Sequence, residues 1–156
     1  MGSGKMRLGM GLVSALALSV ASLSAEAQTD VTFWHSFGSG KGAEAIDLLV
    51  ERFNGSQEDV IVTAEFVGDY DEMVTKLQAA IPAGNQPDIV QLEATRYGLF
   101  ADRGTLEPLE PYFEATGQAF VDDIRPFALE ASLYQGNSYV IPFNVSTPLL
   151  YYNKDA

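Results

Sequence analysis

Four short stretches of this sequence hold polar and aromatic side chains that could bind a small ligand. They are Trp34 with His35, Tyr70, Glu93, and the run Asn144-Val145-Ser146-Thr147. Aromatic ring faces pack against the C–H bonds of polyols, while carboxylate, amide and hydroxyl groups hydrogen-bond to polyol hydroxyls. Each side chain also has an ordinary structural use in packing, capping or solvation. The ligand-binding hypothesis therefore rests on their convergence at one place in the fold.

Three predicted strands would produce that convergence. Apolar residues alternate with polar ones in 30–34 and 60–64, and 88–92 is a short apolar run after a proline. Between them lie two amphipathic helices, the second capped by Asp69. Their expected buried faces are Ile46, Leu49, Val50 and Phe53, then Met73, Leu77, Ala80 and Ile81. This order predicts an α/β fold with a parallel sheet and right-handed crossovers, and such sheets bind ligands at the carboxyl ends of their strands.

The remainder of the chain is less regular. We expect a short helix from Thr95 to about Gly104, a surface connection over 106–111, and a helix over 124–133 with Pro126 in its first turn. Turn residues at 134–138 then lead into a predicted closing strand, 139–143. No internal repeat or low-complexity segment is visible.

The stretch 141–155, IPFNVSTPLLYYNKD, begins within that closing strand and continues beyond it. Pro142 cannot donate to a sheet ladder, and the amide and hydroxyl side chains that follow favour a break in the sheet. Such a break could present polar groups to a ligand at the sheet edge, or it could be a plain strand–loop–strand connection. Residue types alone leave both interpretations open.

The glycine-rich loop 35–42, HSFGSGKG, resembles a phosphate-binding loop only in part. His35 stands at the position of its first glycine, and Gly42 stands where a serine or threonine would bind magnesium. The sequence therefore predicts no nucleotide hydrolysis. An ordinary strand-to-helix turn and a set of helix-start amides near an anion both remain open.

Composition limits the classes of partner. The chain has 156 residues, a net charge of −12, no cysteine and one histidine. The negative charge argues against nucleic acid and anionic membrane surfaces as partners. A lone histidine without cysteines argues against a zinc site. We expect no metal, no other cofactor and no disulfide.

Residues 1–27 are predicted to be a signal peptide. Lys5 and Arg7 precede the apolar run 8–23, and Ala25-Glu26-Ala27 supplies the small residues of a cleavage site. The alternative is a membrane anchor, for which the run is short and contains several glycines and serines. We expect cleavage after about Ala27 and export, with residues 28–150 forming an α/β lobe.

Four motifs carry a resemblance to a known family. They are FWHSF at 33–37, GDYDEMVTKL at 68–77, GNQPDIVQLE at 84–93 and PFNVSTPLLYYNKDA at 142–156. Together they resemble periplasmic sn-glycerol-3-phosphate-binding proteins, the substrate-binding components of ABC importers. The resemblance implies the N-terminal lobe of a two-lobe periplasmic-binding-protein-like fold. It places residues 151–156 at the start of the crossover to a second lobe, which suggests a truncated copy. The alternative is a small autonomous domain.

The resemblance also assigns roles. It places ligand contacts at Tyr70 and Ser146, and at Glu93 if the loop is shifted by one residue, since without a gap the family's glutamate matches Ala94. It implies that the second lobe, including an arginine, binds the phosphate. The expected protein is a periplasmic monomer that binds a glycerophosphate, catalyses nothing and delivers its ligand to a membrane permease. The alternatives are a mono- or oligosaccharide-binding protein, a secreted hydrolase and a purely structural domain.

Overall fold

The computed structural model describes residues 27–146 and 149–155. The predicted signal peptide, apart from Ala27, and Thr147 lie outside the described residues. Within the described part, no helix is both long enough and apolar enough to cross a membrane.

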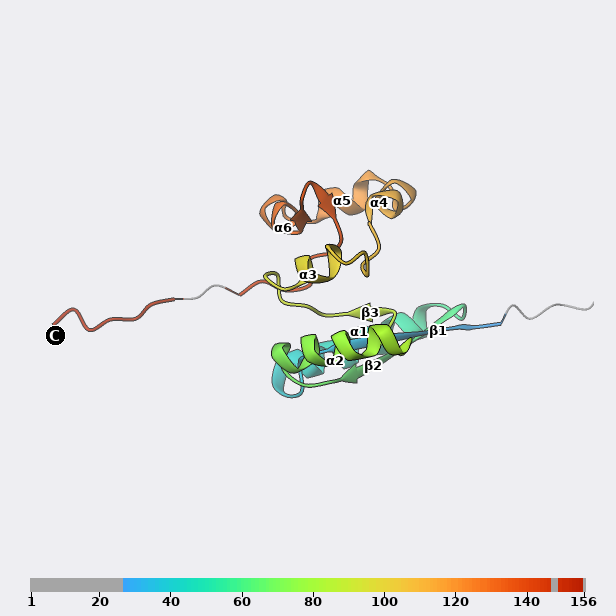
Figure 1. Cartoon of the computed structure of the whole chain (residues 1–156), viewed down its shortest axis with the longest axis horizontal. Helices are drawn as coiled ribbons and strands as arrows, with labels where there is room; N and C mark the ends of the chain where they lie inside the picture. Colours follow the sequence, from blue (N-terminus) through green and yellow to red (C-terminus); the bar gives the residue numbers. More distant parts are fainter. Residues whose placement is uncertain (1–26, 147–148, 156) are drawn as a thin grey trace, which may run out of the picture.

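A three-stranded parallel sheet forms one layer of the molecule. Its strands are β1 (Thr29–His35), β2 (Val60–Phe66) and β3 (Ile89–Val90), in the order β2-β1-β3. Phe33 of β1 is level with Ala64 on one side and Ile89 on the other. The predicted parallel α/β arrangement is confirmed, and the carboxyl ends of the three strands lie at one edge (Figure 1).

The third strand is shorter and more exposed than predicted. The sequence suggested a largely buried strand over 88–92, but only Ile89 and Val90 join the ladder, and Ile89 is 50% exposed. The Asp88 carboxylate accepts hydrogen bonds from the backbone N–H and the hydroxyl of Thr32, both at 2.8 Å. The Thr32 N–H is therefore bonded to a side chain, and the regular ladder begins only at Ile89.

Helix α2 (Tyr70–Ala83) matches its prediction closely. Asp69 accepts hydrogen bonds from the N–H groups of Asp71 and Glu72, and the Glu72 side chain accepts one from the Asp69 N–H. This capping box fixes where the helix starts. Of the predicted buried face, Met73, Leu77 and Ala80 are buried and Ile81 is half-buried. Gly84 ends the helix in the left-handed conformation.

Helix α1 (Gly40–Ser56) buries less of its apolar face than predicted. Ile46 is 1% exposed, whereas Leu49 is 52% and Phe53 is 44% exposed. Outside α1, Phe33, Val62 and Phe143 line the hollow beside this face. The expectation that α1 buries Leu49 and Phe53 was therefore wrong, because the hollow leaves both side chains partly open to solvent.

A second layer, shown in yellow to brown in Figure 1, consists of short helices. They are α3 (Tyr97–Ala101), α4 (Glu110–Thr116), α5 (Gln118–Asp123) and α6 (Pro126–Ala131). The helix predicted over 124–133 is corrected to 126–131, because Arg125 precedes a proline and takes an extended ψ of 129°. Helix α4 begins inside the predicted connection 106–111, and α5 was not predicted.

The predicted closing strand, 139–143, is not a strand. The chain instead forms the hairpin β4 (Leu133–Tyr134) and β5 (Asn137–Ser138), which pair with each other. Gln135 and Gly136 make its turn with positive φ angles of 52° and 87°. Residues 139–143 then run on without a strand partner in the described part of the chain, partly because Pro142 has no N–H to donate.

The Thr32–Asp88 contact leads to a prediction about pH. Hydrogen bonds from the backbone and side chain of Thr32 lower the pKa of the exposed Asp88 carboxyl. A lowered folded pKa stabilises the protein above the ordinary aspartate pKa of about 4, and that stabilisation is lost as the pH falls through the folded pKa. Asp88→Asn should therefore lower unfolding stability slightly at pH 7, and the difference should shrink in acid. Urea unfolding at a series of pH values measures it, and a difference that grew below pH 4 would contradict this account.

Candidate functional site

A groove of about 840 Å³ lies between the two layers. Its walls come from residues 88–95 at the carboxyl end of β3, from α3 and α6, and from the segment 139–146. It therefore occupies the position at which parallel α/β sheets bind ligands.

Four of the six predicted ligand-binding residues line this groove: Tyr70, Glu93, Asn144 and Ser146. Tyr70 is the first residue of α2, so the capping box holds its backbone at the groove edge. Glu93 lies in the segment after β3, and Asn144 and Ser146 lie on the extended segment after Pro142. The start of α2, the segment after β3 and the segment after Pro142 thus line the same groove.

Trp34 and His35 do not line the groove in the described structure. His35 is 6% exposed and packs against Phe33 and Phe66, with ring centroids 5.7 Å and 6.2 Å apart. Burial lowers the pKa of His35, and the charge of Asp47 offsets this only in part. A buried neutral imidazole is a poor partner for an anion. The assignment of Trp34 and His35 to ligand binding stays a prediction that this groove does not support.

Sequence reasoning missed Gln91, which also lines the groove and is 6% exposed. Its Oε1 accepts a hydrogen bond from the Ser36 N–H at 2.9 Å, and its Nε2 donates to Asn144 Oδ1 at 3.4 Å. A glutamine in the predicted strand 88–92, otherwise apolar between Asp88 and Leu92, was the available signal. Buried polar side chains are nearly always hydrogen-bonded, so such a residue marks a specific contact.

Arg96 was also missed, and it connects two of the candidate residues. Its guanidinium lies 2.6 Å from the Asp71 carboxylate and 3.5 Å from the Glu93 carboxylate. Asp71 is next to Tyr70 in α2. Arg96 therefore joins the start of α2 to the segment after β3, beside Tyr70 and Glu93. These are exposed ion pairs, which contribute little to stability but can orient the carboxylates.

The groove is acidic and partly aromatic. Asp88, Glu93 and Glu107 line it, while no lysine or arginine of the described chain does. Tyr97 lines it as well, with its hydroxyl donating to the carbonyl oxygens of Ala131 and Leu133. Arg96 offsets the charge of Glu93 only in part because it also pairs with Asp71, so a phosphate group would still meet repulsion from Asp88 and Glu107. Hydroxyl groups would find acceptors and ring faces.

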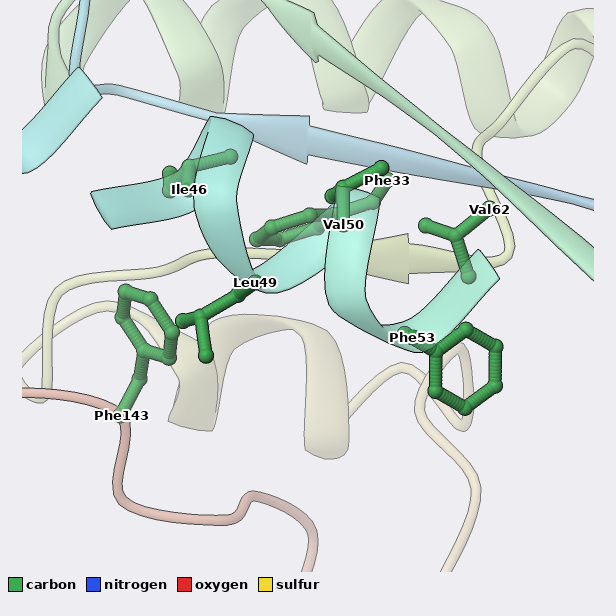
Figure 2. A pocket seen from close by; sticks show the side chains of 7 residues that line it. All are labelled: Phe33, Ile46, Leu49, Val50, Phe53, Val62 and Phe143. Carbon is green, nitrogen blue, oxygen red and sulfur yellow. The ribbon is translucent and has the colours of Figure 1, made fainter. Parts of the chain in front are cut away.

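A second, apolar hollow of about 180 Å³ lies under α1 (Figure 2). Leu49 of α1 and Phe143 of the segment after the hairpin both border it. Phe143 also lies 6.4 Å from the ring of Phe33 and 6.3 Å from that of Phe37. The side chains that line the hollow are all apolar and could not orient a polar ligand. The packing of Phe143 against Phe33 and Phe37 helps to hold the chain just before Asn144.

In the described residues, no three histidine, aspartate or glutamate side chains gather as a metal site would require. The groove carboxylates come from two segments, Asp88 and Glu93 from 88–95 and Glu107 from the connection before α4. Among the described residues, their hydrogen bonds and ion pairs join them to Thr32, Arg96 and Tyr112. The site has the make-up of a binding groove for a polar small molecule.

Comparisons with known proteins agree with this architecture. Residues 38–156 match the model of the bacterial extracellular solute-binding protein family. Over 149 residues the chain is 35% identical to the sn-glycerol-3-phosphate-binding periplasmic protein UgpB of Escherichia coli (strain K12), covering 92% of this chain and 33% of that protein. Over 146 residues it is 33% identical to UgpB of Pectobacterium atrosepticum, covering 90% and 32%. The chain spans about a third of the length of these curated relatives.

Solved structures give the same result. UgpB from Mycobacterium tuberculosis in complex with glycerophosphocholine superposes with a TM-score of 0.67 at 28% identity, over 75% of this chain and 30% of that one. The sugar-binding protein MalE from Xanthomonas citri superposes with a TM-score of 0.63 at 31% identity, over 73% and 28%. The fold is thus that of the N-terminal lobe of a periplasmic-binding-protein-like architecture. The chain belongs to the family of bacterial extracellular solute-binding proteins.

Proposed function

We propose that this chain is the ligand-binding first lobe of the substrate-binding component of an ABC importer, and that its ligand is sn-glycerol 3-phosphate or a related glycerophosphodiester. The observation that carries the proposal is the groove in which Tyr70, Glu93, Asn144 and Ser146 meet at the strand ends. The relatives named for binding sn-glycerol 3-phosphate support the choice of ligand.

The acidic groove suggests how such a ligand would be oriented. Because Asp88, Glu93 and Glu107 line the groove without a lysine or arginine from the described chain, the glycerol hydroxyls would face this lobe. The phosphate would point away, toward basic groups outside the described part. A second lobe closing over the ligand would supply them, and domain closure would signal capture to the permease.

The remaining assignments follow from this proposal. The protein would be exported to the periplasm, with residues 1–27 as its cleaved signal peptide, and would act as a monomer. Its partners would be the small ligand and the membrane permease, not nucleic acid. It would bind without catalysis, which agrees with relatives that are named as binding proteins. A secreted hydrolase would need a nucleophile with a base, a metal cluster or two facing carboxylates.

A saccharide ligand is the second candidate, and the aromatic wall favours it. Tyr70, Tyr97, Phe127 and Tyr139 line the groove, and aromatic faces stack on sugar rings. The sugar-binding protein MalE from Xanthomonas citri shares the fold. The groove volume of about 840 Å³ would also accept a disaccharide.

Titration by NMR can distinguish these ligands. We expect glycerol 3-phosphate to shift the amide signals of Tyr70, Glu93, Asn144 and Ser146 with millimolar affinity, because the open groove leaves the ligand in contact with water. Inorganic phosphate alone should leave those signals unchanged. Ser146→Ala should weaken the response, whereas the matched change Ser39→Ala, at an exposed serine before α1, should not.

Stronger shifts with maltose than with glycerol 3-phosphate would favour the saccharide instead. Micromolar binding of glycerol 3-phosphate would contradict the expectation that this lobe alone holds only the glycerol end. Shifts in none of the four residues with either ligand would reject the groove as the binding site.

A further inference from the structure

The hydrogen bonds of Gln91 form a chain that runs from the backbone into the groove. The Ser36 N–H donates to Gln91 Oε1, and Gln91 Nε2 donates to Asn144 Oδ1. Asn144 lines the groove and is exposed, and its Nδ2 makes no hydrogen bond to another described residue. In the described part, the hydrogen bond from Gln91 to Asn144 is also the one that joins residues 139–155 to the sheet layer.

The direction of each bond in this chain follows from the first donor. A backbone N–H can only donate, so the Gln91 atom facing Ser36 must be the amide oxygen. The amide nitrogen of Gln91 then faces Asn144 and can only donate, so the Asn144 atom facing it must be the oxygen. The amide nitrogen of Asn144 is left as the group available to the groove.

We propose that Gln91 is a positioning residue that makes Asn144 a hydrogen-bond donor in the groove. The ligand atom that meets the amide nitrogen of Asn144 is then an acceptor, such as a hydroxyl or phosphate-ester oxygen. This is of use in a groove whose charged walls are carboxylates, because Asp88, Glu93 and Glu107 can only accept when ionised. Asn144 supplies a donor to a groove that three carboxylates also line, and a polyol hydroxyl can both accept from the one and donate to the others.

Gln91→Glu would reverse this arrangement without shortening the side chain. One oxygen of the introduced carboxylate would still accept from the Ser36 N–H, and the other would attract the Nδ2 of Asn144. The amide of Asn144 would rotate and present its oxygen to the groove. We expect glycerol 3-phosphate to bind about tenfold more weakly, as the loss of one hydrogen bond to the ligand implies. At low pH a protonated carboxyl can again donate to Asn144, so part of the affinity should return.

The ligand-free protein gives a readout that does not depend on binding. In the wild type the side-chain NH₂ of Asn144 should exchange its protons with water rapidly, because nothing in the described part accepts from it. In Gln91→Glu the same NH₂ should become protected from exchange, because it would donate to the new carboxylate. The variant Asn144→Ala assigns that NMR signal by removing it. If the Asn144 NH₂ exchanged with water at the same rate in the wild type and in Gln91→Glu, the proposal would be overturned.

Two further variants control for charge and for folding. Gln86→Glu adds the same charge at an exposed residue shortly before β3, and it should change neither the exchange of Asn144 nor the affinity. Asn144→Asp leaves the buried Gln91 intact but removes the donor, so it should lose as much affinity as Gln91→Glu. Equal losses in Gln86→Glu and Gln91→Glu would show a charge effect alone and would contradict the proposal.

The consequence for the ligand rests on the proposed function, and the two can fail separately. If the wild type does not respond to glycerol 3-phosphate or maltose, the proposed function is wrong. The role of Gln91 can still be tested by the hydrogen exchange of the Asn144 side-chain NH₂. If binding occurs but Gln91→Glu leaves both exchange and affinity unchanged, the role of Gln91 is wrong and the proposed function stands.

Discussion

Met73→Ala is expected to lower the free energy of unfolding by about 2–5 kcal/mol, the usual cost of truncating a buried methionine. Met73 is 0% exposed and lies with Leu77 and Ala80 on the buried face of α2. The lost side chain removes apolar contact and leaves a cavity that the helix backbone cannot fill. For a domain of ordinary marginal stability this is a large share of the total. Urea unfolding followed by circular dichroism measures it.

The matched control is Gln78→Ala, an exposed position on the same helix. It should change stability by less than about 0.5 kcal/mol, as surface substitutions usually do. Met73 is also one helical turn from Tyr70, so loosening of α2 should move Tyr70 at the groove edge. A loss below about 1 kcal/mol for Met73→Ala would mean that α2 is not anchored through this residue.

The elements predicted well from sequence are those whose signals are local. The capping box begins at Asp69 and the apolar spacing sets the buried face, so α2 was predicted with its correct cap and with three of its four expected core residues buried, Met73, Leu77 and Ala80. The alternating apolar residues of β1 and β2 set their bounds to within a few residues. In these cases neighbours in the chain decide the structure.

The prediction errors arose where residues distant in the sequence decide the local structure. The apolar face of α1 predicts burial, but Leu49 and Phe53 stay about half exposed because their burial depends on what the rest of the fold packs against them. The apolar run 139–143 suggests a strand, but a strand needs a neighbour, and the hairpin pairs with itself instead. Short helices such as α5 have too few residues to show a periodic pattern.

The same distinction applies to the candidate site. Polar residues after strands were expected to converge, and Tyr70, Glu93, Asn144 and Ser146 do line one groove. His35 was expected there too, but its side chain is buried with Phe33 and Phe66. The hydrogen-bond chain through Gln91 could not be predicted, because it depends on which atoms approach after folding.

Gly68→Ala is expected to cost about 2–4 kcal/mol, from about 1–3 kcal/mol of backbone strain and about 1 kcal/mol for the weakened helix cap. Gly68 has a φ of +120°, a value that residues with a Cβ rarely adopt. An added Cβ would also lie 2.0 Å from the Glu72 carboxylate oxygen that accepts from the Asp69 N–H. The carboxylate would have to move, which opens the capping box and frees the first turn of α2. Urea unfolding measures the cost.

Gly55→Ala is the matched control, because Gly55 lies within α1 and an added Cβ would meet no atom within 4 Å. That change should be neutral or stabilising by up to about 1 kcal/mol, since alanine favours the helix. Adding Glu72→Ala to Gly68→Ala should cost less than the sum of the two single changes, because both open the same cap. Strict additivity would show that the strain at Gly68 acts alone. Coupling would show that the backbone strain at Gly68 and the capping box act together at the start of α2, where Tyr70 lies.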